Sequence, residues 1–396
     1  MSYEHYTSTE PLRQGLNKVV VRAGQIMYNI STTGGVCMIN SVTFENFRGL
    51  RHLELPELSQ ITLLTGKNSA GKSSVLEGIF LLMGHASPDT FEKIRSIRGL
   101  PAATDITKLW EPVFYNLDTS KSLTISAKCN NQSLLLDYAR DESFSSFDST
   151  QEVLNTFISF TNPVNPVYAL RYSFSDGNTH ESGHLFVNAA GNLAMGADPK
   201  SKTNPTNALP NTLIVRSAAA YGIDDATIAG WFGDLELNDG KQQVIEALRI
   251  IDPDITDIKT IVQQRYVQLY IKTKHSTLPL KLSGDGMCKL AYLVLAILHS
   301  PNSIILIDEI ENGFHYSMQE AFWETIGAAA KTSNSQIIAT THSYECISHA
   351  VEGITRAGMR NDFCLYRLGR AGEKNQAVHY SGDLLKDAVE SYMEVR

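Results

Sequence analysis

The sequence predicts a layered α/β protein with a mixed β-sheet, and three observations lead to this prediction. Apolar runs of strand length alternate with stretches that have the spacing of a helix. A glycine-rich segment joins the first apolar run to its helix. The two ends of the chain are strongly patterned, whereas the middle reads as a long insertion of mixed strands, helices and loops. The predicted buried strands are 61–65, 303–307 and 336–340, and the predicted helices between and after them are 73–82, 287–298 and 318–330.

The pattern divides the chain into four parts. Residues 1–37 are polar and form an N-terminal extension, and Met38 is an alternative translation start because a clean strand pattern follows it. Residues 38–85 form a lobe with the glycine-rich loop, 86–210 form the insertion, and 211–396 form a second lobe.

The first lobe opens on a strand at Ile39 to Phe47, a turn at 48–51 and a second strand at 52–55. Turn pairs and β-branched runs predict short strands in the insertion and beyond it. The predicted strands are 123–127, 134–138, 167–174, 184–187, 258–262, 266–273 and 363–368. The predicted helices in this part are 226–237 and 240–251, and the predicted loops are 141–151 and 194–211, the latter a linker or mobile loop.

Composition excludes several classes of protein. The 396 residues are 43% hydrophobic and 19% charged, which is typical of a globular chain. No apolar run approaches the length of a membrane helix and no signal core precedes residue 38, so we expect a cytoplasmic protein without a membrane partner. Five scattered cysteines support neither a disulfide framework nor a zinc site. The net charge of −8 gives nucleic-acid binding no support, although a phosphate-backbone contact at Lys93, Arg95 and Arg98 is a weaker alternative to a solvated helix face.

The segment from Gly66 to Ser74 fits the phosphate-binding pattern G-x-x-x-x-G-K-[ST]. An apolar strand precedes it and a helix follows, which is the context that the pattern needs; a chance glycine-rich turn is the alternative. Lys72 is expected to reach the β- and γ-phosphates, and the Ser73 hydroxyl to bind Mg²⁺. The nucleotide-binding residues predicted here are Gly66, Lys67, Asn68, Ser69, Ala70, Gly71, Lys72, Ser73 and Ser74.

A carboxylate pair follows the buried strand near residue 305. Asp308 stands at the end of that run, in the Walker B position that orders Mg²⁺ beside a phosphate-binding loop. Glu309 next to it can accept a proton from an attacking water, as general bases do. The alternative is a helix N-cap followed by an acidic residue in the first turn.

Two further segments complete the candidate site. His342 follows the strand 336–340 and can bond the γ-phosphate or the attacking water, the alternative being a satisfied histidine at a strand end. Before the helix 287–298 lies a small-residue turn that suits phosphate at a helix N-terminus; a plain flexible loop is the alternative. Its residues are Ser283, Gly284, Asp285 and Gly286.

The order of these motifs resembles that of ABC-type ATPase heads, and their wording is similar to the RecF/SMC/OLD-like AAA ATPases of prokaryotes. The resemblance is carried by Asn46–Leu50, Thr65–Ser74, Asp308–Tyr316 and Ala339–Ser343. It covers about residues 38–396 and is loose in the insertion. It implies an ABC-type P-loop NTPase head with a layered mixed β-sheet and a long α+β insertion, using ATP and Mg²⁺.

The resemblance also implies how the head works. Two copies meet on ATP, so that Ser283 and Gly284 of one copy close the nucleotide site of the other. Glu309 would be the general base, His342 the γ-phosphate sensor, and Arg48 would lie near the nucleotide. The signature reads Ser-Gly-Asp-Gly rather than Ser-Gly-Gly-Gln, and Gln132 is only a guess for the Q-loop glutamine.

Three functions remain open from the sequence. The first is an ATP-hydrolysing switch that controls a separate effector such as a nuclease, in antiphage defence or DNA repair. The second is a nucleotide-binding scaffold or clamp with slow turnover. The third is a transporter ATPase subunit, against which the Asn46–Leu50 opening and the altered signature argue. Nuclease activity is not expected from this chain itself, because no Toprim pattern follows the last predicted strand.

Overall fold

The computed structural model describes most of the two lobes and part of the insertion. The expected extension 1–37 lies outside it except for one short strand, and so does most of the loop expected at 141–151. The described residues are 27–30, 38–85, 87, 89–101, 103, 107–130, 132–141, 154–159, 169–187, 192–198, 209, 212–216, 225–263, 266–372, 374–391 and 393–395.

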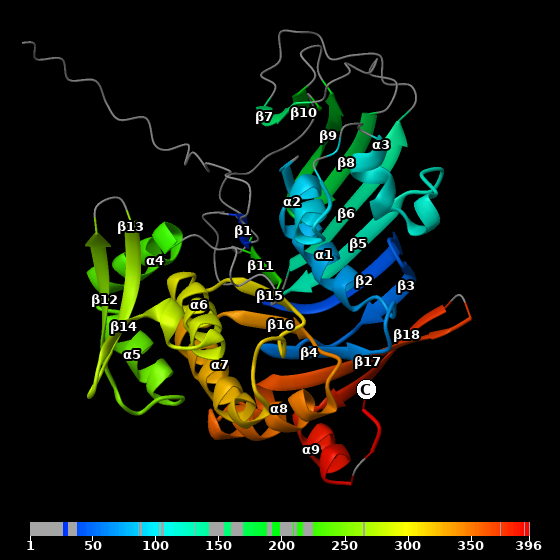
Figure 1. Cartoon of the computed structure of the whole chain (residues 1–396). Coiled ribbons are helices and arrows are strands. Elements are labelled where there is room, and N and C mark those ends of the chain that lie inside the picture. The colour runs from blue at the N-terminus through cyan, green and yellow to red at the C-terminus, as the bar shows by residue number, and fades with distance from the viewer. Residues whose placement is uncertain are drawn as a thin grey trace, which may run out of the picture.

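A seven-stranded mixed sheet forms the centre of the nucleotide lobe (Figure 1). Its five inner strands run parallel, and an antiparallel strand closes each edge. This confirms the predicted α/β class. The strands in sheet order are β1 (Met27–Ile30), β11 (Thr212–Arg216), β15 (Ile304–Asp308), β16 (Gln336–Thr340), β4 (Ile61–Gly66), β17 (Phe363–Ala371) and β18 (Lys374–Ser381).

Alternating side chains bury both faces of this sheet, as expected for parallel strands. Ile61 and Leu63 of β4 face one hydrophobic core, while Leu64 faces a second. The helices that contribute to the first core include α6 (Asp285–His299), α7 (Gln319–Ser333), α8 (Tyr344–Arg356) and α9 (Gly382–Glu390). The second core takes α1 (Lys72–Met83), which is buried along almost its whole length.

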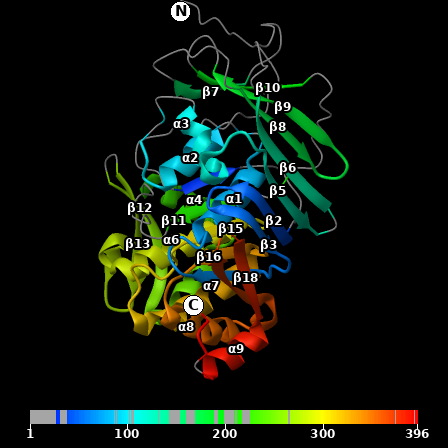
Figure 2. The ribbon, with the colours of Figure 1, turned by 90° about the vertical axis from the view of Figure 1, so that its right-hand side faces the viewer.

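A second, antiparallel sheet packs on the other side of α1 (Figure 2). It joins the first hairpin of the chain to the strands of the insertion, so one continuous sheet crosses the expected boundary at residue 86. In sheet order the strands are β3 (Leu50–Leu55), β2 (Ile39–Phe47), β5 (Leu123–Cys129), β6 (Gln132–Asp141), β8 (Ala169–Ser175), β9 (His180–Val187), β10 (Asn192–Ala197) and β7 (Leu154–Ser159). The short helices beside it are α2 (Asp89–Ile97), α3 (Thr107–Trp110), η1 (Glu111–Val113) and η2 (Tyr115–Leu117).

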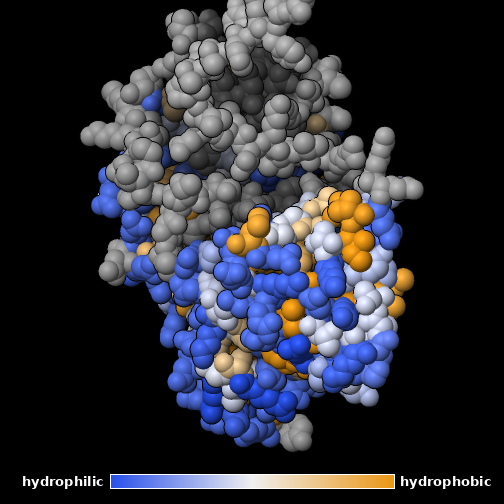
Figure 3. All heavy atoms as spheres, turned by 90° about the vertical axis from the view of Figure 1, so that its left-hand side faces the viewer, coloured by the Kyte–Doolittle hydropathy of each residue, from blue (hydrophilic) through white to orange (hydrophobic). Residues whose placement is uncertain are grey.

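A small third sheet lies against the helical side of the nucleotide lobe. Two helices cover it, α4 (Asp225–Leu237) and α5 (Lys241–Arg249). The side of the molecule that carries this sheet is mainly hydrophilic, with hydrophobic groups in a few places (Figure 3). Its strands are β12 (Ile255–Gln263), β13 (Tyr266–Thr273) and β14 (Thr277–Pro279), and the remaining turns of 3₁₀ helix are η5 (Leu280–Leu282), η6 (Tyr316–Met318) and η7 (Arg360–Asp362).

Three sequence-based expectations need correction. The linker expected at 194–211 begins within β10, because Leu193 to Ala197 pair with β9 despite the weak strand preference of alanine and glycine. Asp308 was expected beside the phosphate-binding loop, which would make β15 the neighbour of β4, but β16 lies between these two strands. The scattered cysteines supported no disulfide framework, whereas Cys129 is disulfide-bonded.

None of the helices that the structure describes is long and apolar enough to cross a membrane.

Candidate functional site: a nucleotide site and a separate signature loop

The phosphate-binding loop connects the end of β4 to the start of α1 and depends on its glycines. Gly66 has φ +134°, and a Cβ there would lie 2.1 Å from the carbonyl oxygen of Leu368. Gly71 has φ +105°, and a Cβ there would lie 2.4 Å from Cδ2 of Leu50. Ser69 also has positive φ. The loop therefore curls tightly between β17 and the β2–β3 hairpin, in a backbone shape that glycine permits.

Lys72 spans this loop from its first helical position. Its side chain is buried, and Nζ donates to the carbonyl oxygens of Gly66, at 2.6 Å, and Lys67, at 3.1 Å. Burial lowers the pKa of Lys72, while the carboxylates of Asp308, Glu311 and Glu309 oppose that shift. The ammonium is thus held within the curl of the loop, where phosphate oxygens can replace the two carbonyls.

Ser73 and Asp308 meet although they come from separate elements. Ser73 Oγ on α1 lies 3.0 Å from each carboxylate oxygen of Asp308, which ends β15. Thr340 ends β16, the strand between them, and its hydroxyl donates to Asp308 Oδ1 at 2.6 Å. The Walker A serine and the Walker B carboxylate are therefore adjacent, and Thr340, to which the sequence analysis gave no role, forms a second side-chain bond to Asp308.

Glu309 follows in a left-handed backbone conformation, with φ +55°. Its backbone N–H donates to Thr340 Oγ1 at 2.8 Å. Asn312 Nδ2 donates to Glu309 Oε2 at 2.8 Å, which fixes the carboxylate. A non-glycine residue in this conformation is uncommon, and here two hydrogen bonds hold it.

The switch segment lies beside the same turn. The backbone N–H of His342 donates to Glu311 Oε1 at 2.7 Å, and the His342 residue itself is exposed. The backbone N–H of Thr341 donates to the carbonyl oxygen of Leu64 on the P-loop strand, at 3.0 Å. Glu311 is a second residue that the sequence analysis left without a role, and it anchors the predicted sensor.

Arg48 lies behind the phosphate-binding loop in the β2–β3 turn. Its Nε is 2.7 Å from Glu77 Oε2 on α1, and Arg98 Nε is 2.6 Å from the other oxygen of Glu77. Burial lowers the pKa of Arg48, opposed by the Glu77 charge. Arg95 donates to the backbone carbonyls of Pro101 and Lys108. Arg95 and Arg98, two members of the basic cluster considered for nucleic acid, therefore pair with groups of the protein itself.

The predicted signature loop occupies a different place. Ser283 is half-buried, and its hydroxyl donates to the carbonyl oxygen of Leu280 in its own turn at 2.6 Å. Gly284 has φ +94°, and it is exposed together with Asp285 at the start of α6. Within the described residues, no hydrogen bond or ion pair joins Ser283–Gly286 to the P-loop or to Asp308.

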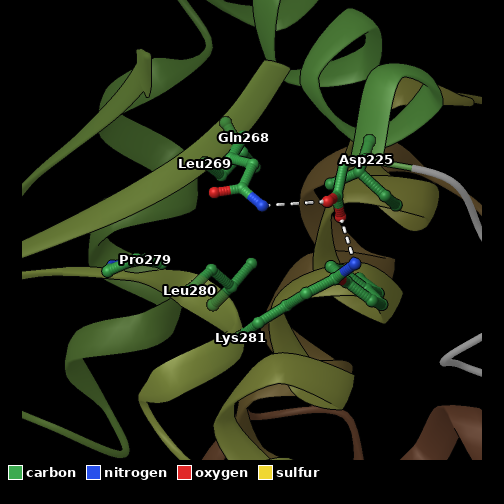
Figure 4. A pocket seen from close by; sticks show the side chains of 8 residues that line it. Asp225, Gln268, Leu269, Pro279, Leu280 and Lys281 are labelled. Atoms are coloured by element: carbon green, nitrogen blue, oxygen red, sulfur yellow. Dashed lines mark hydrogen bonds and ion pairs between the residues drawn. The ribbon is translucent and has the colours of Figure 1, made fainter. Parts of the chain in front are cut away.

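The turn before the signature loop is tied to the small sheet (Figure 4). Lys281 Nζ lies 2.7 Å from Asp225 Oδ1 at the start of α4. Gln268 of β13 donates to the other oxygen of Asp225 at 3.4 Å. The signature loop is therefore anchored at its N-terminal end, whereas Gly284 and Asp285, where α6 begins, are exposed.

The structure thus brings the P-loop, Asp308, Glu309 and the switch segment together, and leaves the signature loop apart. Gln132 begins β6 in the β5–β6 hairpin. Among the described residues, no hydrogen bond joins it to the nucleotide site. The residues missed by sequence reasoning are Thr340, Glu311, Asn312 and Glu77. Thr340, Glu311 and Asn312 lie inside the quoted motifs, but their roles depend on contacts between elements.

Two family models match the two halves of this site. One, described as "AAA ATPase domain", matches residues 38–169, which include the P-loop. The other, described as "AAA domain, putative AbiEii toxin, Type IV TA system", matches residues 223–348, which include the signature loop, Asp308 and His342. Both parts of the nucleotide site therefore match AAA ATPase family models.

Named relatives agree with an ATPase. The chain is 26% identical over 328 residues to a Helicobacter pylori protein called "ATP/GTP phosphatase", covering 78% of this chain and 86% of the relative. It is 40% identical over 60 residues to the "DNA replication and repair protein RecF" of Nitrosococcus oceani, covering 15% of this chain and 16% of that one. The activity class of this ATPase is therefore ATP binding and hydrolysis.

Solved structures of SMC heads show a weak overall likeness. An SMC head bound to the C-terminal winged-helix domain of ScpA has a TM-score of 0.47 at 13% identity, covering 87% of this ATPase and 98% of that chain. The Pyrococcus furiosus SMC head bound to the C-terminal domain of ScpA has a TM-score of 0.45 at 11% identity, covering 90% and 99%.

Proposed function

We propose that this chain is an ATP-driven switch: two copies close on ATP, and the closed dimer controls a separate effector protein in the cytoplasm. The observation that carries this proposal is the division of the site. Lys72, Ser73, Asp308 and Glu309 are interlocked in one place, while the exposed signature loop lies elsewhere on the same chain. A second copy can supply the missing loop.

The phosphate-binding side fits Mg²⁺ together with a nucleotide. Mg²⁺ prefers oxygen ligands, one or two of them from protein and the rest from phosphates and water. Ser73 Oγ and the carboxylate of Asp308 are two such oxygens and already lie 3.0 Å apart. The described residues hold no cluster of three or more metal-binding side chains, which suits a metal that is bound mainly through the nucleotide. When bound, Mg²⁺ would neutralise developing phosphate charge.

Each side chain then has a distinct role in hydrolysis. Lys72 binds the phosphates and orients them against the loop. Glu309 accepts a proton from the attacking water, and its hydrogen bonds to Asn312 and Thr340 fix the direction of the carboxylate. His342 reports the presence of the γ-phosphate through the segment that Glu311 anchors. Arg48, paired with Glu77, supports the base of α1 behind the loop.

The signature loop lies on a surface suited to a second copy. A Cβ at Gly286 would lie 3.5 Å from Met318 and 3.6 Å from Phe314, so α6 and the segment after Walker B pack together. Leu282 is 71% exposed on one side of this contact and Tyr316 is 65% exposed on the other. Large exposed apolar groups beside an exposed phosphate-binding turn are expected at an interface.

The proposed partner is an effector such as a nuclease, for which the eight-stranded sheet offers a broad surface away from the nucleotide. The proposed setting is DNA repair or antiphage defence, since a short stretch is similar to RecF and one family model is named for a putative toxin system.

The experiment combines an ATPase assay with a measurement of molecular mass by light scattering. Wild-type protein should hydrolyse ATP and dimerise transiently, and Glu309→Gln should lose turnover by about 100-fold or more while ATP now traps the dimer. Glu352→Gln, an exposed acid on α8, is the matched control and should behave as wild type. Normal turnover in Glu309→Gln would exclude Glu309 as the base, and a monomer under all conditions would exclude the closing switch.

A further inference from the structure

A buried amine on the signature helix has no role in the site described so far. Lys289 stands on α6, six residues after Ser283, and is 5% exposed. Among the described residues, its Nζ has no hydrogen-bond partner. The centroid of the Phe314 ring lies 4.7 Å from Nζ, and a Cβ at Gly313 would lie 3.8 Å from it. Lysine is almost never fully buried unless it is paired, so this position requires an explanation.

The charges around Lys289 come from the segment after Walker B. Burial lowers the pKa of Lys289 to about 8, and Glu311 is the largest opposing charge, followed by Cys346 on α8 and then Glu309. Burial raises the pKa of the Cys346 thiol to about 12, so this thiol is neutral at physiological pH. The negative charges that act on Lys289 are therefore the carboxylates of Glu311 and Glu309.

Glu311 is only half satisfied. Its Oε1 accepts the backbone N–H of His342 at 2.7 Å, whereas its Oε2 is buried with no hydrogen-bond partner among the described residues. An ammonium and a carboxylate oxygen that both lack a hydrogen-bond partner thus lie in the same buried region, between α6 and the switch segment. Leaving both in place costs stability, and such costs are usually retained where they serve function.

We propose that Lys289 is a positioning residue that links the signature helix to the γ-phosphate sensor. Its ammonium holds Glu311 by charge, and Glu311 holds the backbone at His342. Because α6 begins in the signature loop, a shift of that loop moves Lys289 and is transmitted to the switch. The inference rests on the proposed sensor role of His342, and it does not require the dimer.

Three variants test the link. Lys289→Met keeps the length and the apolar stem but removes the charge, Lys289→Arg keeps the charge, and Lys331→Met on the exposed end of α7 is the matched control. Lys289→Met should lower kcat by about tenfold, which is within the range by which residues that couple two sites change rates. The Kd for ATP should stay within about twofold, because no hydrogen bond or ion pair among the described residues joins Lys289 to the phosphate-binding loop.

Two readouts separate positioning from a merely structural role. Removing an unpaired buried charge should leave the melting temperature of Lys289→Met at or above that of wild type, whereas a structural lysine would lower it. The second readout is the pH profile. Wild-type kcat should fall as pH rises through about 8, since the amine loses its proton there. Lys289→Arg should retain most of kcat and move that fall to higher pH, because a guanidinium stays charged.

The outcomes decide between the two proposals. Wild-type kcat and an unchanged pH profile in Lys289→Met overturn the link, as does a loss of kcat that comes with a lower melting temperature and is not restored by arginine. His342→Ala tests the sensor separately. Wild-type turnover in His342→Ala would remove the sensor role from the proposed function, while wild-type turnover in Lys289→Met overturns only the role of Lys289.

Discussion

The phosphate-binding side and the signature side of this ATPase are built in opposite ways. The first is interlocked: Lys72 bonds the carbonyl oxygen of Gly66, and both Ser73 and Thr340 bond Asp308, so that three strands and a helix are joined. The second is open, with Gly284 and Asp285 exposed and the Ser283 hydroxyl bonded to its own turn. A chain that holds one half of a site ready and exposes the other half is suited to a reaction that requires two copies of the chain to come together first.

The largest expected effect comes from removing the cation of the interlocked side. Lys72→Ala should weaken ATP binding by at least about 100-fold, because two or more charge-assisted contacts with phosphate are lost. Isothermal titration with ATP measures it, and Lys331→Met serves as a control for loss of an exposed charge. Unchanged ATP affinity in a folded Lys72→Ala protein would show that the nucleotide does not bind at this loop.

A substitution on the open side should impair hydrolysis only at the nucleotide site of the partner copy. Ser283→Arg is expected to lower turnover by about 100-fold, because a bulky cation fills the face where the second nucleotide would seat. Mixing Ser283→Arg with Lys72→Ala should restore about a quarter of wild-type turnover, since half of randomly paired dimers carry one intact site.

A matched mixture makes this complementation specific. Lys72→Ala mixed with Glu309→Gln should show no recovery, because both changes damage the side of the site that each chain supplies to its own nucleotide. Recovery in both mixtures, or in neither, would contradict the division of the site between two chains.

Two glycines compare the packing of the two sides directly. Both Gly71 and Gly284 have positive φ, but a Cβ at Gly71 would meet Leu50 at 2.4 Å whereas nothing lies within 4 Å of one at Gly284. Gly284→Ala should cost about 1 kcal/mol of unfolding free energy from backbone strain, and Gly71→Ala about 2–4 kcal/mol because overpacking adds to it. Chemical denaturation measures both, and equal losses would contradict the contrast in packing.

A smaller effect on turnover is expected from the Thr340 hydroxyl, which joins the end of β16 to the Walker B turn. Thr340→Val removes the hydroxyl that donates to Asp308 and accepts from the Glu309 backbone. The loss should lower kcat by about tenfold, in line with about 1–2 kcal/mol for a buried hydrogen bond. Thr340→Ser keeps the hydroxyl and should recover most of kcat. Equal defects in both variants would place the effect in packing rather than in the hydrogen bonds.

The motifs could be read from the sequence because each is contiguous. Apolar runs ending in Gly66, Asp308 and Thr340 predicted strand ends, and parallel strand ends meet at one edge of a sheet. Neither Thr340 as a bridge nor Glu311 as an anchor could be read in this way, because each acts through a residue on another element. Lys289 was given no role, because it lies within the apolar pattern that predicted the helix 287–298.

The middle of the chain was harder to predict for a related reason. Strand β10 contains alanine and glycine, so its local preference is weak and its pairing with β9 decides the structure. The helices α8 and α9 and the edge strand β18 were not predicted. The length of the antiparallel sheet follows from pairings between distant segments, which periodicity alone does not specify.

The continuous antiparallel sheet has a mechanical consequence. Its hairpin β2–β3 touches the phosphate-binding loop through Leu50, and the same sheet extends through eight strands to β7. At about 4.8 Å per strand, that edge lies roughly 34 Å from β3. A tilt of about 5° at the hairpin would displace the far edge by about 3 Å, so the sheet can act as a lever that converts a small change at the nucleotide into a larger movement.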